Sequence, residues 1–359
     1  MPMAHIDYKR ELDELIEIVV SERGSDLHFA VGAHPMIRVS GSLIPLLKKP
    51  ILTPEDSLGF VTALLNNEEK VQAFLLRKEV DFSYAHKEGV RFRGNGFFQR
   101  GGISIALRHI PHTIPTIKEL NLPPILESFA QRPQGFFLAV GPVGQGKSTT
   151  LASIINLINE TRAEHIITIE DPIEYTYEPK KSLIEQREVR TDTEDFATAL
   201  QSVFRQDVDV IMVGEMRGPE TISTAVTAAE TGHLVLSTLH TNNAAQTIDR
   251  VIDTFPAAQQ DQIRVQLAGS LAGIFSQRLI PRIAGGLIPA YELLLNTSAV
   301  ANLIRERRTH EINTVIETGS EHGMIEMNRS LVELVHRGEI TVENAFAYSV
   351  NPKGLDRLM

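Results

Sequence analysis

The feature that most constrains this chain is a glycine-rich loop between an apolar run and a helical pattern. Residues 141–148 read Gly-Pro-Val-Gly-Gln-Gly-Lys-Ser, which matches the phosphate-binding P-loop pattern. Phe136–Val140 before it is typical of a buried strand, and a helix is expected after it. Backbone N–H groups of such a loop turn toward phosphate oxygens, and the helix start adds a partial positive charge. Lys147 would reach the β- and γ-phosphates, and Ser148 would hold Mg²⁺.

Downstream of this loop, short apolar runs alternate with helical patterns. The runs are Phe136–Val140, His165–Ile169, Val210–Val213 and Leu234–Leu236, and the helical patterns cover 147–159, 194–205 and 220–230. A parallel sheet covered by helices on both faces explains this alternation. After Pro256 the pattern is mostly helical, with one further strand near Ile288–Leu294. The sequence therefore predicts an α/β domain.

The N-terminal part has a different pattern. Residues 7–22 predict an amphipathic helix, and strands are expected near 26–31 and 36–39 and as a meander within 80–110. Five prolines then fall within Pro111–Pro133. We expect a small α+β domain, a linker and an α/β domain with a helical C-terminal region. Their predicted bounds are 1–112, 113–133 and 134–359, with the helical region from about 296 to 359.

The composition excludes several classes of protein. There is no cysteine, so disulfide scaffolds, cysteine-ligated zinc and cysteine nucleophiles are excluded. The sequence has no run near the ~18 apolar residues that span a bilayer and no signal peptide, so we expect a cytosolic protein. The net charge is -10, and the whole acidic excess lies after residue 115. Because nucleic-acid-binding domains are usually basic, no nucleic-acid partner is expected.

The strand predicted at Val210–Val213 should carry phosphate chemistry at its end. Its usual aspartate is replaced by Gly214, so a metal-orienting carboxylate must come from elsewhere or be Glu215. Ligands of open α/β sheets lie at the carboxyl ends of the strands. Glu215 is therefore a candidate to polarise the attacking water, and the alternative is a solvated acid at a strand end.

Two further strand ends offer candidate groups. Glu170 follows the run at 165–169 and opens a cluster of three acids within five residues, which could approach a complex of Mg²⁺ and phosphate or form a solvated turn. His240 ends the strand that begins at Leu234, where it could sense the γ-phosphate. His233, at the start of that strand, is expected to be structural. A zinc site is not expected, because the spacing of these histidines fits no short zinc motif.

One stretch of the N-terminal domain, Arg91–Arg108, contains four arginines and no acid. Arg91 and Arg93 alternate with Phe92 on a predicted strand, so both side chains should point to one face. Arg108 lies on the next strand. These arginines could bind single-stranded nucleic acid, could be supplied in trans to a neighbouring subunit's nucleotide, or could be solubilising.

Together these motifs resemble the PilT family of secretion-type ATPases, the retraction motors of type IV pili. The similar segments are the signature Gly24–His28, the arginine strands at Arg91–Asn95 and Arg108, the Walker A loop Gly141–Thr149, the aspartate box Ile169–Glu174, the atypical Walker B Val213–Arg217 and the histidine box within Thr227–Thr241. The resemblance implies a PAS-like N-terminal domain and a RecA-like P-loop ATPase domain.

The resemblance also implies a site and a function. ATP and Mg²⁺ would be the cofactors, and hydrolysis would drive pilus retraction and twitching motility. The nucleotide-binding residues would be Gly141, Pro142, Val143, Gly144, Gln145, Gly146, Lys147, Ser148 and Thr149. Glu215 would be the catalytic glutamate, with His240, Arg91, Arg93 and Arg108 as further catalytic candidates, and Ser148 and Glu170 would lie near the metal.

The same resemblance implies an assembly. It predicts a cytoplasmic homo-hexamer at the inner-membrane base of the pilus machine. Its expected partners are an inner-membrane platform protein and a paralogous pilus ATPase.

The chain departs from the family pattern at three positions. Val143 and Gln145 stand where threonine and serine are usual, and Ala301 replaces an arginine of the retraction motif. An accessory PilU-type paralogue therefore stays open. A pilus-assembly or type II secretion ATPase is a further alternative, although such proteins usually carry a four-cysteine zinc element. A RecA-like nucleic-acid translocase and a ring subunit without hydrolytic activity are alternatives from other classes.

Overall fold

The computed structural model describes residues 7–39, 41–111 and 113–359. The chain divides into two compact units, Met1–Thr113 and Ile114–Met359. The first unit packs helices on an antiparallel sheet, and the second has helices on both faces of a mainly parallel sheet. The predicted fold class, an α/β domain preceded by a smaller α+β domain, is confirmed.

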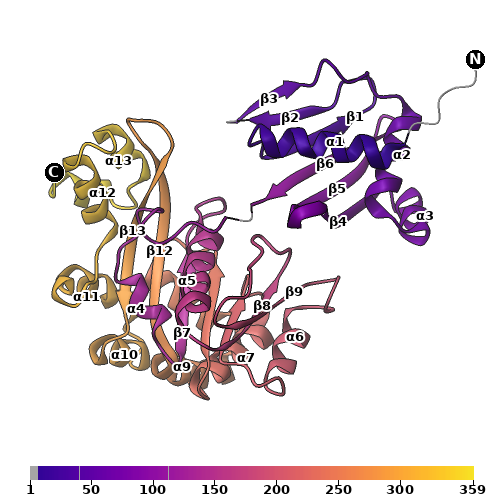
Figure 1. Ribbon diagram of the computed structural model, residues 1–359. Coiled ribbons are helices and arrows are strands. Elements are labelled where there is room, and N and C mark those ends of the chain that lie inside the picture. The colour runs from indigo at the N-terminus through magenta and orange to yellow at the C-terminus, as the bar shows by residue number, and fades with distance from the viewer. Residues whose placement is uncertain (1–6, 40, 112) are drawn as a thin grey trace, which may run out of the picture. The chain divides into compact units, whose positions relative to one another are not determined.

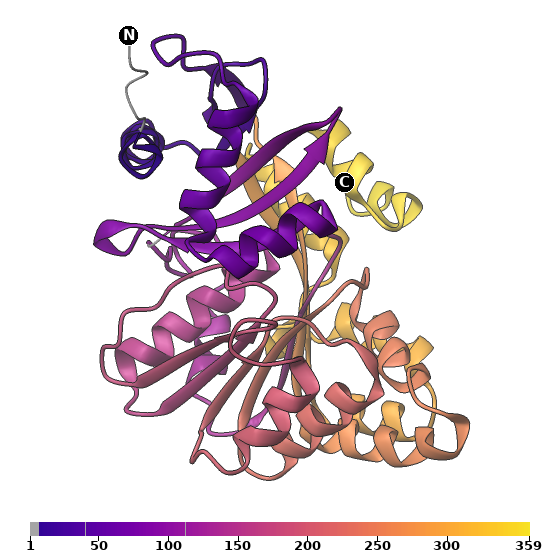
Figure 2. The same cartoon turned by 90° about the vertical axis from the view of Figure 1, so that its right-hand side faces the viewer.

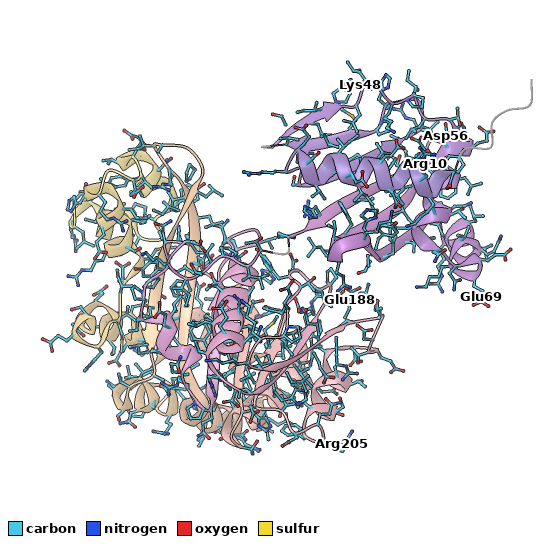
Figure 3. The ribbon with its side chains drawn as sticks, viewed as in Figure 1. Arg10, Lys48, Asp56, Glu69, Glu188 and Arg205 are labelled. Atoms are coloured by element: carbon cyan, nitrogen blue, oxygen red, sulfur yellow. The ribbon has the colours of Figure 1, made fainter. Side chains whose placement is uncertain are left out.

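The first unit contains a six-stranded antiparallel sheet in the order β3-β2-β1-β6-β5-β4. Its elements are α1 (Tyr8–Ser21), β1 (Asp26–Ala30), β2 (Met36–Val39), β3 (Ser42–Pro45), α2 (Pro54–Leu65), α3 (Glu68–Arg77), β4 (Glu79–Ala85), β5 (Arg91–Gln99) and β6 (Gly102–Ile110). Within this unit, α1 and α2 lie against the sheet (Figure 1). Helix α2 begins with a capping box, in which Thr53 and Asp56 satisfy each other's backbone N–H groups. Asp56 is among the residues labelled in Figure 3.

Side-chain alternation gives this sheet two different faces. Leu27 pairs in register with Leu107, and both are buried with Phe29 in the core shared with the helices. Asp26 precedes Leu27 on β1, and Arg108 follows Leu107 on β6. These two residues pair in register on the opposite face of the sheet. The arginine-bearing face is therefore the one that the core does not use.

The second unit contains a seven-stranded sheet in the order β13-β12-β7-β11-β10-β8-β9. Its strands are β7 (Gly135–Val140), β8 (His165–Glu170), β9 (Leu183–Glu188), β10 (Val210–Val213), β11 (Leu234–Leu239), β12 (Leu271–Pro281) and β13 (Leu287–Leu295). Every neighbouring pair is parallel except β12–β13, which is antiparallel. The carboxyl ends of β7, β11, β10 and β8 therefore meet at one edge.

Helices cover both faces of this sheet, as Figure 2 shows for the lower part of the view. The helices are α4 (Leu126–Ala130), α5 (Lys147–Thr161), α6 (Phe196–Val203), α7 (Gly218–Glu230), α8 (Ala244–Asp253) and α9 (Ala257–Ser270), then α10 (Ser298–Arg305), α11 (Ile312–Thr318), α12 (Met327–His336), α13 (Val342–Tyr348) and α14 (Pro352–Asp356). Alternate β7 residues enter different cores: Leu138 packs with the α6–α9 side and Phe137 with the α4–α5 side. Among the described residues, no helix has the length and apolar character needed to cross a membrane.

Two segments differ from the sequence-based expectation. The chain from Pro256 was expected to be helical up to the strand near 288, but Leu271–Pro281 is the long strand β12, so that prediction was wrong. Helix α9 ends directly where β12 begins, without a proline or a polar turn, and pairing with β7 and β13 determines the strand. The segment expected as a linker contributes Ile117, Leu126 and Phe129 to the core of the second unit.

Candidate active site

The glycine-rich loop leaves β7 in the middle of the sheet and leads into α5. Gly141, Gly144 and Gly146 have φ values of 144°, 76° and 79°, where residues with a Cβ are strained. Gly141 is also closely approached, because a Cβ there would lie 2.4 Å from the carbonyl oxygen of Gln277 on β12. Glycine at 141 is therefore required by both conformation and space.

Lys147, the first residue of α5, is directed back into its own loop. Its side chain is buried, and Nζ donates hydrogen bonds to the carbonyl oxygens of Gly141 and Pro142, each at 2.8 Å. His240 Nδ1 lies 3.3 Å from the same nitrogen. Burial lowers the pKa of Lys147 to about 8, although the nearby Glu215 carboxylate opposes this shift. The Lys147 ammonium group thus contacts both the P-loop and His240 at the end of β11.

Glu215 and His240 lie on neighbouring strand ends and face each other. Glu215 Oε1 is 3.7 Å from His240 Nε2, and its other oxygen is 2.8 Å from the guanidinium of Arg217. Burial, and then the positive charge of Lys147, lower the pKa of His240. Thr238 Oγ1 donates to the carbonyl of Gly214 at 2.6 Å and so fixes the turn that carries Glu215. Lys147 at the start of α5, His240 after β11 and Glu215 after β10 form one cluster.

Glu170 lies beside the position where the usual aspartate is missing. Strands β8 and β10 pair Ile169 with Val213, and a Cβ on Gly214 would lie 3.4 Å from Glu170 Cα. The neighbouring strand therefore brings a carboxylate next to the position where β10 has none. Of the two sources predicted for a metal-orienting acid, another part of the chain or Glu215, Glu170 is an example of the first.

The Glu170 carboxylate is fully buried and already accepts several hydrogen bonds. Its donors are the Thr168 hydroxyl at 2.6 Å, the Glu174 backbone N–H at 3.2 Å and the Gln186 amide at 3.3 Å. Burial raises the pKa of Glu170 to about 7, against these hydrogen bonds. Ser148, in contrast, is exposed in the first turn of α5. Among the described residues, no group of three or more His, Asp or Glu side chains is arranged as a metal site.

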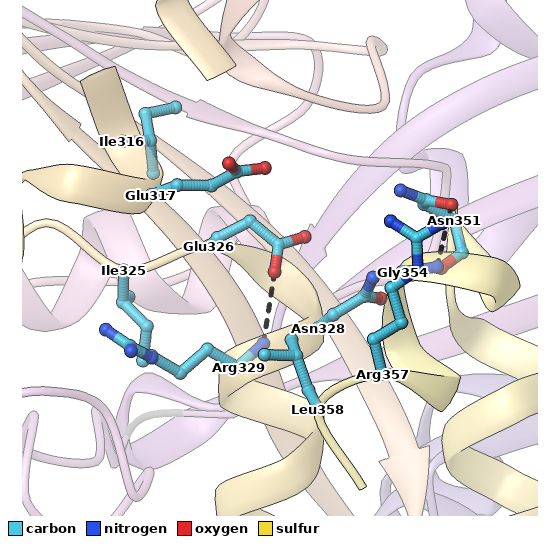
Figure 4. Close-up of a pocket in the computed structure, with 10 residues that line it drawn as sticks. All are labelled: Ile316, Glu317, Ile325, Glu326, Asn328, Arg329, Asn351, Gly354, Arg357 and Leu358. Atoms are coloured by element: carbon cyan, nitrogen blue, oxygen red, sulfur yellow. Dashed lines mark hydrogen bonds between the residues drawn. The ribbon is translucent and has the colours of Figure 1, made fainter. Parts of the chain in front are cut away.

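A pocket of about 280 Å³ adjoins the P-loop. Its lining combines the start of α5, the β12–β13 hairpin and residues 119–122, with Gly146, Thr150, Gln277, Leu279, Leu287 and Pro289 among the contributors. Apolar and amide groups beside a phosphate loop suit a planar base. A second pocket, of about 250 Å³, is lined by Glu326, Arg329 and Asn351 and belongs to the C-terminal helices α11, α12 and α14 (Figure 4).

The three candidate arginines belong to the first unit. Arg93 on β5 pairs in register with Arg108 on β6, and Phe92 between Arg91 and Arg93 is fully buried on the other face. Arg108 Nε donates to Asp26 Oδ1 at 3.0 Å, while 72% of its side chain stays exposed. The arginines thus share one face, and a buried carboxylate orients Arg108.

Several residues that contact the P-loop were not among those predicted from the sequence. The Thr150 hydroxyl donates to Gln277 Oε1 at 2.6 Å, and Gln145 Oε1 accepts from the backbone N–H of Leu279 at 2.7 Å. Tyr175 lies within hydrogen-bond distance of the Thr149 hydroxyl, at 2.9 Å. The contacts to Gln277 and Leu279 depend on β12, a strand that the sequence did not predict. The largely apolar run Leu271–Phe275 was the available signal.

Residues 8–345 match the family described as Type II/IV secretion system protein. The chain belongs to this family. A relative from Pseudomonas aeruginosa named "Type IV pilus retractation ATPase PilT" is 42% identical over 337 residues, covering 93% of this chain and 97% of its own. A second, named "Type IV pilus ATPase PilU", is 40% identical over 350 residues, covering 97% and 91%. The resemblance to the PilT family is therefore confirmed.

A solved structure of this secretion-system family agrees with the fold. The crystal structure of the pilus retraction motor PilT with bound ADP matches with a TM-score of 0.91 at 45% identity. The match covers 96% of this chain and 99% of that one. Both units of the chain therefore have counterparts in one solved member of the family.

Proposed function

We propose that this chain is an ATP-hydrolysing motor of the type IV pilus machinery that drives pilus retraction. The observation that carries the proposal is the cluster of Lys147, His240 and Glu215, which three adjacent strand ends bring together beside the P-loop. Similarity to proteins named as pilus ATPases over nearly the whole chain supports it.

In the proposed reaction, the loop from Gly141 to Thr149 binds the phosphates of ATP. Its backbone N–H groups face the phosphate oxygens, and Lys147 exchanges its two carbonyl partners for the β- and γ-phosphates. Glu215 accepts a proton from the attacking water, and His240 lies between that acid and the lysine. The pocket next to Gly146 would take the base.

Mg²⁺ is part of this proposal. The exposed Ser148 hydroxyl fits direct binding, while the Glu170 carboxylate, already occupied by three donors, fits a contact through water. The ion would neutralise charge on the transferred phosphoryl group. Arg91, Arg93 and Arg108 would supply positive charge to the same group, from their own chain or from a neighbour.

We further propose a cytoplasmic homo-hexamer at the inner-membrane base of the pilus machine, with an inner-membrane platform protein and a paralogous ATPase as partners. The acidic net charge supports the absence of nucleic acid among the partners. An accessory role of the PilU type is the second candidate, and Ala301 favours it because an arginine is usual there.

The test combines ATPase activity with native mass. We expect purified protein to hydrolyse ATP as a hexamer and Lys147→Ala to lose nucleotide binding or turnover. Lys180→Ala is the matched control, because Lys180 is exposed and its side chain pairs with Glu160. Normal hydrolysis by Lys147→Ala would contradict the site. Complementation of a retraction-deficient strain separates the two candidates, since an accessory protein would not restore retraction alone.

A further inference from the structure

Strand β12 touches the P-loop through one of its faces. The Gln277 side chain is buried and accepts the hydrogen bond of the buried Thr150 hydroxyl at 2.6 Å. A Cβ on Gly146 would lie 2.9 Å from Gln277 Nε2, so the amide packs directly against the last glycine of the loop. Two residues along the strand, the backbone N–H of Leu279 donates to Gln145 Oε1. Gln277 and Leu279 thus hold both the loop and the start of α5.

The opposite face of β12 touches the loop that follows β11. Ser276 Oγ donates to the carbonyl oxygen of Asn242 at 2.9 Å, and Arg278 donates to the Asn242 side-chain oxygen at 3.3 Å. On β13, Glu292 pairs in register with Ser276 and accepts the Ala244 backbone N–H at 2.8 Å. Asn242 is two residues after His240, so these contacts fix the loop that carries His240.

The far end of the same strand reaches the C-terminal helices. Ile280 is buried in a core with Leu331 of α12, and Asn344 of α13 donates to the Pro281 carbonyl at 3.0 Å. Arg282, just after the strand, pairs with Glu339 at 2.5 Å. The C-terminal helices therefore hold β12 in place, and β12 in turn restricts movement of the P-loop and of the His240 loop.

We propose that β12 positions the two nucleotide loops through alternate side chains: Gln277 sets nucleotide affinity through the P-loop, and Ser276 sets turnover through the His240 loop. The inference rests on the ATPase function proposed above. Ser276 is a positioning residue that acts through the loop it holds. Gln277 acts on the P-loop in the same way and also lines the pocket beside it. Because neighbouring strand residues point to opposite faces, two adjacent substitutions produce different kinetic effects.

The first experiment is a double-mutant cycle on nucleotide affinity. Gln277→Leu removes the acceptor and Thr150→Val removes the hydroxyl at nearly constant volume. We expect each to raise the Kd of a fluorescent ATP analogue roughly tenfold, the scale of one unmade buried hydrogen bond. The double variant should match the single variants, since both lose the same bond. Additive effects, or an unchanged Kd, would overturn the role of Gln277. If Gln277→Leu does not fold, Thr150→Val carries the test.

The second experiment measures Ser276→Ala. We expect kcat to fall severalfold while the Kd stays within about twofold of wild type, the reverse of the pattern for Gln277. A raised Kd with unchanged kcat would overturn this half of the inference.

Asn159→Leu is the matched control for a merely structural effect. Asn159 is buried on α5, and its side chain bonds the backbone of Glu178 and Lys180. This variant should lower Tm and leave the Kd unchanged. Wild-type protein that neither binds nor hydrolyses ATP would contradict the proposed function itself. If wild-type protein is active and the Gln277 and Ser276 variants keep wild-type Kd and kcat, only the role of β12 is contradicted.

Discussion

Replacing Glu292 by glutamine should change how the stability of this protein depends on pH. Glu292 is 5% exposed on β13, and burial raises its pKa from 4.5 to about 7. The Ala244 N–H and Arg278 oppose this shift, and the charge of Glu326 adds to it. Glutamine keeps the oxygen that accepts the Ala244 hydrogen bond and removes the titration.

The sign follows from proton binding. Between pH 4.5 and about 7 the folded protein holds the Glu292 proton while the unfolded chain releases it. The free energy of unfolding therefore falls as pH rises through this window. A pKa that rises from 4.5 to about 7 corresponds to about 3 kcal/mol, which is an upper limit because the charged side chain can relax.

The assay is urea unfolding of wild type and Glu292→Gln between pH 4.5 and 8.5. We expect equal stability near pH 4.5 and a variant more stable by up to about 3 kcal/mol at pH 8. Glu321→Gln, at an exposed position, is the control and should follow wild type throughout. If the free energies of unfolding of wild type and Glu292→Gln change in parallel with pH, Glu292 does not have the raised pKa that its burial implies.

Three further outcomes test the proposed site. Glu215→Gln should bind ATP but hydrolyse it at least ~100-fold more slowly, measured by single-turnover kinetics, and near-normal turnover would remove Glu215 from the reaction. Mixed rings of Arg108→Ala and Glu215→Gln chains, confirmed by native mass, should recover part of the activity that each homogeneous ring lacks. No recovery, together with full activity of Arg108→Ala alone, would make Arg108 a surface residue. Gly141→Ala should lose nucleotide binding by calorimetry, because its Cβ would meet the Gln277 carbonyl; retained affinity would show that the loop can shift.

The parts of the site that the sequence predicted are those fixed by local patterns. The P-loop glycines, Lys147 and the strand ends at Glu170 and Glu215 follow from short motifs and from the rule that parallel strands share an edge. His240 was predicted at the same edge of the sheet, and its Nδ1 lies 3.3 Å from Lys147 Nζ.

The contacts that the sequence did not predict are long-range ones. Gln277 is 127 positions from Thr150, and only the pairing of β12 with β7 brings the two together. Asp26 and Arg108 are likewise 82 positions apart and meet through strand register. Such pairs depend on which strands are neighbours, and that order is not encoded in any local window.

The direction of the Lys147 side chain has a consequence for how tightly ATP is held. The ammonium group already has two carbonyl acceptors from its own loop, so binding exchanges one set of hydrogen bonds for another. The measured affinity is then the difference between these two sets. The Gly141 and Pro142 carbonyl oxygens therefore compete with the phosphates of ATP for the Lys147 ammonium group. Product release gains from this arrangement, because the departing phosphate leaves no buried cation unpaired.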